Sequence, residues 1–200
     1  MTGTGTRDMR GRTRHGIAGA ILAMLMLTGQ AGAQVDRCDW TEGAFWDGAG
    51  LPAVERCIDA GADIEARTEH GSTPLHNAVV LYGKAEIVQA LITAGADIEA
   101  RTEDGRTPLH RAARNSIGAE AVQALIAAGA DIGVRSNNGD TPLHEAAHGG
   151  TAESVQALID ARADIRAQTE DGRLAADLAE GNAAVRNHPV FWTLNDARFD

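Results

Sequence analysis

The sequence predicts an all-α solenoid of helix-turn-helix units with hairpin loops, because three short motifs recur in a single phase. The tetrapeptide Thr-Pro-Leu-His stands at residues 73–76, 107–110 and 141–144, in steps of 34 residues. The string Gly-Ala-Asp-Ile keeps this phase at 61–64, 95–98 and 129–132, and a fourth copy has Arg162 in place of Gly. Between these motifs, Val-Gln-Ala-Leu-Ile stands at 88–92, 122–126 and 155–159. Stacked identical units are the architecture that such a period indicates.

Each motif has a physical role within the repeat. Thr is a favourable helix N-cap and Pro is favoured at the first helical position, so Thr-Pro begins a helix whose Leu and following Ala residues face inward. A second helix carries apolar residues at helical spacing, and Gly95 ends it in a left-handed cap. Asp104-Gly105 then predicts the turn of an exposed hairpin. If Arg162 keeps the left-handed cap, it costs roughly 1 kcal/mol.

Together the Thr-Pro-Leu-His tetrapeptide, the Ala residues after it, the Gly-Ala-Asp corner and the glycine turn resemble the ankyrin repeat over roughly residues 38–200. The resemblance implies a capping repeat at 34–66, three full repeats at 67–168, and a C-terminal capping repeat with a final helix at 169–200. Ankyrin hairpins often carry Asp where this chain has a hydroxyl residue. These hydroxyl residues are Thr68, Thr102, Ser136 and Thr169.

Aromatic residues gather at the two ends, outside the regular repeats. Solenoids need atypical terminal units to cover the apolar faces of their outermost repeats. We therefore expect one cap around helices at about 42–48 and 51–60, and another ending in an amphipathic helix at about 190–198. The aromatic residues assigned to these caps are Trp40, Phe45, Trp46, Phe191, Trp192 and Phe199.

The first 33 residues have the three parts of a secretory signal peptide. A polar segment with four arginines precedes an uncharged apolar run at 16–28, and Ala31-Gly32-Ala33 supplies the small residues of a cleavage site. We expect cleavage after Ala33 and a periplasmic or secreted protein; an uncleaved anchor is the alternative. The run is shorter than the roughly 20 residues of a membrane span. Since no other stretch is long enough, the mature form is expected to have no membrane span. We also expect it to be a monomer.

The two cysteines, Cys38 and Cys57, both lie in the predicted N-terminal cap. In an exported chain, an isolated pair usually forms a disulfide, and a helical hairpin between the two would bring them together. Two reduced, buried thiols are the alternative. A catalytic thiol is disfavoured because no histidine is near either cysteine in sequence.

The ionisable residues argue against an enzyme or a metal site. His76, His110 and His144 recur in register, but neighbouring repeats are about 8–10 Å apart, too far for shared metal coordination, so we expect hydrogen bonds to hairpin backbone. Likewise the corner Asp recurs in every repeat, as a structural residue does. We predict no cofactor and no catalytic residue. The net charge of −10 also argues against nucleic-acid binding, and indicates either a basic partner or simply a solvated surface.

The resemblance implies a concave face that binds a protein partner, formed by hairpin tips and the exposed side of the first helices. Its predicted residues are Arg67, Glu69, His70, Ser72, Arg101, Glu103, Asp104, Arg106, Arg135, Asn137, Asn138 and Asp140, with Arg111 and Glu145 among those on the helices. Arg67, Arg101 and Arg135 form a regular row that could hold carboxylates or stack on aromatic rings. Variation among repeats is the reason to favour recognition here, although absence of structural constraint would also allow it.

The predicted function is therefore an exported ankyrin adaptor or regulator that binds one partner protein. Two alternatives stay open. One is a structural or envelope-associated assembly protein without a discrete partner. The other is an enzyme whose site the sequence does not reveal.

Overall fold

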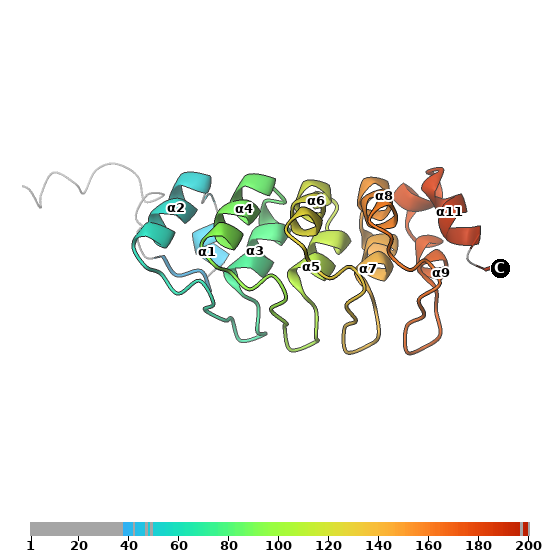
Figure 1. Ribbon diagram of the computed structural model, residues 1–200, viewed down its shortest axis with the longest axis horizontal. Coiled ribbons are helices and arrows are strands. Elements are labelled where there is room, and N and C mark those ends of the chain that lie inside the picture. The colour runs from blue at the N-terminus through green and yellow to red at the C-terminus, as the bar shows by residue number, and fades with distance from the viewer. Residues whose placement is uncertain (1–37, 42, 47, 49, 197, 200) are drawn as a thin grey trace, which may run out of the picture.

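The computed structural model describes residues 38–41, 43–46, 48, 50–196 and 198–199. The predicted signal peptide lies outside these residues. Within them the regular structure is helical, and the helices form a single elongated stack (Figure 1). Their bounds are α1 Gly43–Trp46, α2 Leu51–Asp59, α3 Pro74–Leu81, α4 Ala85–Thr93, α5 Pro108–Arg114, α6 Ala119–Ala127, α7 Pro142–Gly149, α8 Ala152–Asp160, α9 Ala175–Ala179, α10 Ala183–Arg186 and α11 Val190–Asp196. The predicted all-α solenoid is confirmed.

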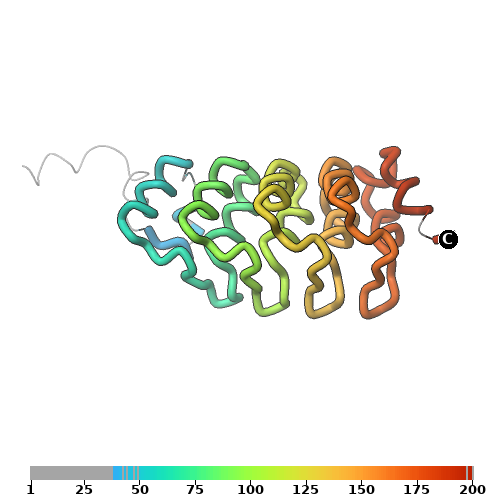
Figure 2. Tube along the Cα trace, viewed as in Figure 1, coloured from blue at the N-terminus to red at the C-terminus, as the bar shows by residue number. Residues whose placement is uncertain are grey.

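The helices form two rows with the hairpins on one side. Helices α3, α5, α7 and α9 pack in succession as an inner row, and α2, α4, α6 and α8 pack in succession as an outer row. The hairpins between successive repeats project side by side in one direction, away from the outer row (Figure 2). Each repeat therefore contributes one hairpin and one inner helix to the same side of the molecule.

The Thr-Pro motifs begin the inner helices as predicted. Thr73, Thr107 and Thr141 are the N-caps of α3, α5 and α7, each followed by Pro. The next Leu and the Ala residues are fully or almost fully buried, as in Leu109 and Ala112, because the neighbouring inner helices pack directly on them. In the outer row, α4 buries Ile87, Val88 and Leu91 on one side. Small side chains and a narrow apolar stripe thus allow close stacking of the two rows.

A disulfide closes the N-terminal cap. Cys38 and Cys57 are bonded, with their Cα atoms 5.3 Å apart, so the predicted pairing is found in the structure. Trp40, Phe45 and Trp46 pack against one another at ring-centroid distances of 5.0–6.1 Å and are almost fully buried. The N-terminal aromatic residues therefore cover the end of the stack, as predicted.

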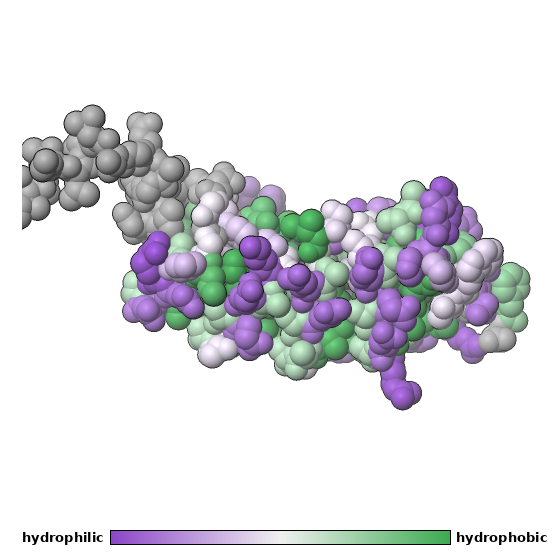
Figure 3. All heavy atoms as spheres, turned by 90° about the horizontal axis from the view of Figure 1, so that it is seen from above, coloured by the Kyte–Doolittle hydropathy of each residue, from purple (hydrophilic) through white to green (hydrophobic). Residues whose placement is uncertain are grey.

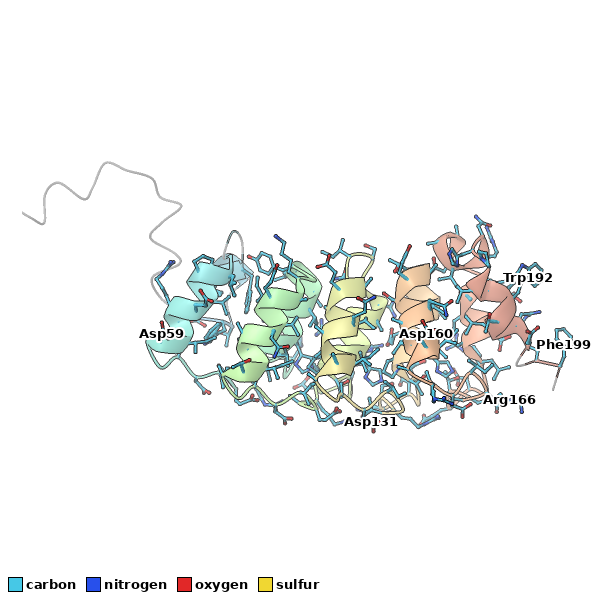
Figure 4. All side chains as sticks on the ribbon, turned by 45° about the horizontal axis from the view of Figure 1, so that its top comes forward. Asp59, Asp131, Asp160, Arg166, Trp192 and Phe199 are labelled. Atoms are coloured by element: carbon cyan, nitrogen blue, oxygen red, sulfur yellow. A yellow bond between two sulfur atoms is a disulfide. The ribbon has the colours of Figure 1, made fainter. Side chains whose placement is uncertain are left out.

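The C-terminal cap corrects the prediction for two aromatic residues. Val190 and Leu194, one helical turn apart on α11, are buried against the stack. Trp192 lies midway between them in sequence and therefore points to the opposite side of the helix, where it is 66% exposed. Phe199, beyond the end of α11, is 79% exposed. Both side chains project from the end of the stack (Figure 4) rather than covering it.

None of the helices in the described part of the chain is both long and apolar enough to cross a bilayer.

Candidate functional site

Each hairpin is closed by a hydroxyl group near its start. The hydroxyls of Thr68, Thr102, Ser136 and Thr169 each accept a hydrogen bond from the backbone N–H four residues later, at 3.1–3.2 Å. Glycine at the hairpin turn is required by space as well as by conformation. Gly105 has φ +76°, and a Cβ there would lie 2.9 Å from the backbone nitrogen of Asn137 in the next hairpin. The hairpins are therefore tight turns in close contact with each other.

Backbone hydrogen bonds connect the hairpin tips. The N–H of Glu103 donates to the carbonyl of His70 at 3.2 Å, and that of Asn137 donates to the carbonyl of Asp104 at 3.1 Å. A third bond of this kind runs from Glu170 to Asn138 at 3.0 Å. Side chains on these tips are thus carried by a continuous, ordered backbone frame.

The arginine row reinforces the same frame. Arg67 Nη1 donates to the carbonyl of Arg101 at 2.9 Å, and Arg101 Nη2 donates to the carbonyl of Arg135 at 2.6 Å. Arg135 Nη2 repeats the contact with the carbonyl of Gln168, also at 2.6 Å. These guanidinium groups link each hairpin base to the next. Whether they also hold a partner's carboxylates stays a prediction.

Histidines join each inner helix to the following hairpin. His76 Nδ1 accepts from the N–H of Thr73 at 3.2 Å, while His76 Nε2 lies 3.1 Å from the carbonyl of Arg106. Since a backbone N–H can only donate and a carbonyl can only accept, the ring is neutral with its proton on Nε2. Equivalent bonds connect His110 to the carbonyl of Asp140 and His144 to that of Arg173. The predicted structural role of the three histidines is confirmed.

Burial reinforces this neutral state. Loss of solvation by burial lowers the pKa of His76 to about 4, although the hydrogen bond to the Arg106 carbonyl acts in the opposite direction. Burial likewise lowers the pKa of His110 and of His144. The three rings are therefore uncharged at neutral pH, where they fix the distance between inner helix and hairpin.

An ionic cluster ties the second and third repeats together. Glu145, on α7, accepts from Arg106 Nε at 2.7 Å and from Arg114 Nη1 at 2.8 Å, and Arg106 also bonds to Asp104. Burial alone would raise the pKa of Glu145, but the hydrogen bonds from Arg114 and Arg106 outweigh it and the pKa is lowered. The carboxylate is therefore ionised and fixed in place at neutral pH.

Two adjoining hollows lie where the hairpins meet the inner helices. The first, of about 560 Å³, is lined by Thr41, Arg67, Thr68, Glu69, His70, Ser72, Asn77 and Arg111. The second, of about 500 Å³, is lined by Val80, Asp104, Arg106, His110, Arg111, Arg114 and Asn115. Arg111 belongs to both. We call these two hollows together the hairpin groove, and the hairpin tips with the groove the hairpin face.

The side away from the hairpins differs in character. Seen from that side, hydrophilic side chains are spread along the length of the stack among small hydrophobic areas (Figure 3). Two exposed hydrophobic residues are Leu81, the last residue of α3, and Ile117, between α5 and α6, at 47% and 56%. This side also has hollows, one lined mainly by α2 and α4 and one mainly by α6 and α8, whereas the hairpin face combines its hollows with the hydrogen-bonded backbone frame.

Comparison with known families matches ankyrin repeats, described as three copies, at residues 44–136 and 116–188. These matches extend over most of the chain and coincide with the stacked repeats. The chain belongs to the ankyrin-repeat family. A search among curated proteins found no match. Ankyrin repeats are generally protein–protein interaction modules, which directs attention to the hairpin face as the site of contact.

The ankyrin hairpin face holds most predicted site residues at its surface. Exposed side chains belong to Arg67, Glu69, His70, Arg101, Glu103, Asp104, Arg135, Asn137 and Asn138. Partly buried ones belong to Arg106, Arg111 and Asp140. Ser72 and Glu145 are 4% and 2% exposed, so their inclusion among exposed contact residues is corrected. Packing explains both: Ser72 accepts from Arg111 at 2.8 Å, and Glu145 is enclosed by its two arginines.

Thr41 and Asn115 line the groove, although neither of them was assigned a role from the sequence. Thr41 comes from the N-terminal cap, and no repeat motif indicates that this cap lies beside the first hairpin. Asn115 donates from Nδ2 to the carbonyls of Val79 and Val80 at the end of α3, which places it in the groove wall. Asn at the end of an inner helix was the available signal for such a capping contact.

The described part of the ankyrin stack contains no group of three or more His, Cys, Asp or Glu side chains placed to hold a metal ion. Its recurrent Asp residues instead close local turns. Asp97 Oδ1, for example, accepts from the N–H of Glu99 at 2.9 Å, and the carboxylate of Glu65 reaches the N–H of Asp97 at 2.8 Å. These carboxylates support the corners between repeats, in agreement with the sequence interpretation.

Proposed function

We propose that this chain is an exported ankyrin adaptor or regulator that binds one partner protein through its hairpin face. The segment ending at Ala33 would direct it to the periplasm or the exterior and then be removed. The Cys38–Cys57 disulfide supports an oxidising destination, because such bonds persist mainly outside the reducing cytosol.

The observation that carries this proposal is a varied set of side chains on a repeated, hydrogen-bonded frame. At the hairpin tip, Glu103 is followed one repeat later by Asn137, and Asp104 by Asn138. On the inner helix, Asn77 is followed by Arg111. The frame itself does not change, since the hydroxyl, histidine and arginine bonds recur from repeat to repeat.

Rigid display is the mechanism. A specific interface buries about 1,200–2,000 Å² in total, an area that requires several neighbouring hairpins. Because the tips are already connected through His70, Asp104 and Asn138, docking orders little additional backbone. Less conformational entropy is lost, so modest contacts suffice for useful affinity.

A matched pair of variants tests the face. The face variant changes His70→Glu and Asn138→Glu, two exposed tip side chains. The control changes Gln89→Glu and Gln123→Glu, which are exposed on outer helices α4 and α6. Both variants alter charge by the same amount. The arginine row is left intact because Arg67, Arg101 and Arg135 also hold the hairpins together.

The full chain and both variants would be expressed in an exporting host, and retained proteins identified by mass spectrometry after incubation with periplasmic extract. We expect one protein to be held by the wild type and the control and lost by the face variant. Retention by all three, or self-association with no second protein, would contradict the proposal and favour a structural assembly role. The N-terminal residue of the recovered chain tests cleavage after Ala33.

A further inference from the structure

Four arginines line the hairpin groove, although the chain as a whole carries a net charge of −10. These are Arg67, Arg106, Arg111 and Arg114. Arg111 lies at the junction of the two hollows and lines both. The groove is therefore a local concentration of guanidinium groups on an acidic molecule.

Two of the carboxylates near these arginines are already paired with arginine side chains. Glu145 is bound by Arg106 and Arg114, and Asp104 is bound by Arg106. Glu69, exposed on the hairpin, lies 3.5 Å from the imidazole of His70 and forms no salt bridge with an arginine among the described residues. Consequently, Arg106 and Arg114 have compensating negative charge within the groove. Arg111 shares the field of Asp104, which Arg106 already binds, and Glu69 is the one described carboxylate of the groove that has no arginine partner.

Arg111 and Arg67 have only neutral acceptors within the described residues. Arg111 Nη2 donates to the hydroxyl of Ser72 at 2.8 Å, and Arg67 Nη1 donates to the carbonyls of Gly71 and Arg101. Among the described side chains, neither guanidinium has a carboxylate within salt-bridge distance. Their positive charge also acts on the buried His76. Burial is the largest cause that lowers the pKa of His76, and the charges of Arg111 and Arg67 lower it further.

We propose that the hairpin groove binds an acidic segment of the partner protein, with a carboxylate of that segment paired to Arg111 and a second one near Arg67. This inference rests on the proposed function and specifies the partner's chemistry. Planar guanidinium groups can bind a carboxylate through two parallel hydrogen bonds, and such charge-assisted bonds are stronger in a partly desolvated groove than in water.

The remaining groove residues suit a polypeptide. Thr41 and Asn77 supply neutral polar groups in the first hollow, and Val80 supplies an apolar contact in the second. A nucleic acid is disfavoured, because its long phosphate backbone would extend beyond the groove over a chain whose net charge is −10, whereas a short acidic segment can stay within the groove.

The test uses random dodecapeptides displayed on phage and selected against protein purified from expression of the full chain. Selected peptides would be synthesised with a fluorescent label and their Kd measured by anisotropy on four proteins. These are the wild type, Arg111→Gln, Arg111→Lys and Arg56→Gln. Arg56 is exposed on outer helix α2, so its substitution makes the same charge change outside the groove. Melting curves followed by circular dichroism confirm that each variant folds.

We expect selected peptides to be enriched in Asp and Glu. Arg111→Gln should weaken their binding about tenfold, Arg111→Lys should weaken it less, and Arg56→Gln should leave it unchanged. Added salt should reduce the wild-type affinity, because part of the groove is open to solvent.

Two results would overturn the inference: selected peptides without acidic enrichment, or equal affinity for the wild type and Arg111→Gln. A labelled oligothymidine that binds as tightly as the acidic peptides would also overturn it, by indicating general anion binding. If non-acidic peptides are selected and the His70→Glu, Asn138→Glu variant releases them, the proposed function stands while the acidic segment is rejected. Peptides insensitive to every variant would reject both.

Discussion

Arg106 in the second hairpin donates from Nε to Oε1 of Glu145 on α7, 2.7 Å away, and this bond joins two successive repeats. Arg114 of α5 completes the cluster from the other side. The Glu145 side chain is only 3% exposed, whereas those of Arg106 and Arg114 are 27% and 50% exposed. The cluster thus places a buried carboxylate beneath two guanidinium groups that still reach solvent.

Removing that carboxylate should destabilise the stack. We expect Glu145→Ala to lower the free energy of unfolding by about 1–3 kcal/mol, because two arginines lose their counter-charge while solvent reduces the penalty. Urea unfolding measures this change in the free energy of unfolding. The control Glu55→Ala, an exposed position on α2, should change stability by less than about 0.5 kcal/mol. Equal losses in the two variants would show that the cluster contributes nothing specific.

The buried histidines predict a loss of stability in mild acid. The pKa of His76 in the folded protein is about 4, against an ordinary value of 6.5, so the unfolded chain takes up a proton first as pH falls. The stability that the neutral His76 contributes is fully present above about pH 6.5. It is lost between about pH 6.5 and about pH 4, by up to roughly 1.4 kcal/mol per pH unit. The lowered pKa values of His110 and His144 act in the same direction.

Urea unfolding of the wild type and His76→Gln at several pH values between about 7.5 and 4.5 measures this effect. The variant should be less stable at neutral pH, because Gln cannot both accept from Thr73 and donate to the Arg106 carbonyl in the same geometry. Its stability should then fall less steeply with acidification. Parallel pH profiles would mean that His76 does not titrate as the structure indicates.

Much of this fold could be predicted because the same local interactions recur in each repeat. Thr73-Pro74 begins a helix by capping and fixed φ, and Gly95 ends one through a left-handed conformation, with φ +101° in the structure. These effects depend on neighbouring residues only. The position of Trp192 could not be read in the same way, because it depends on which side of the short helix α11 meets the stack.

The site was less predictable, because its geometry depends on contacts between repeats. The 34-residue spacing of Arg67, Arg101 and Arg135 was visible, yet nothing local showed that each side chain reaches a backbone carbonyl one repeat away. Glu145 belongs by register to the exposed side of its helix, and the approach of Arg106 and Arg114 buries it. Sequence therefore identified the face but not which of its charges are already paired.

Reduction of the Cys38–Cys57 disulfide should loosen the N-terminal cap before the rest of the stack. The loop spans 19 residues, and opening it should cost the cap about 3 kcal/mol by the entropic account. Repeat stacks depend mainly on nearest-neighbour contacts, so distant repeats should remain folded. The fluorescence of buried Trp40 and Trp46 should change at lower urea concentration in the presence of reductant than in its absence.

The double variant Cys38→Ala, Cys57→Ala supplies the control for this experiment. It should resemble the reduced protein and be insensitive to reductant. Helical circular dichroism should report a later transition than the cap fluorescence in both cases. A single coincident transition, unaffected by reductant, would show that the disulfide does not stabilise the cap.

Arg162 provides a reciprocal test of backbone strain at the repeat corner. It has φ +71°, whereas Gly129, one repeat earlier, has φ +91° and no neighbour within 4 Å of a Cβ built at that position. We expect Arg162→Gly to stabilise the protein by about 0.5–1 kcal/mol, since relief of left-handed strain exceeds the added entropy of the unfolded chain. Gly129→Arg should destabilise it by about 1 kcal/mol, because the space is open and only the backbone resists. Denaturant unfolding of both variants measures these changes, and the same sign in both would reject strain as the cause.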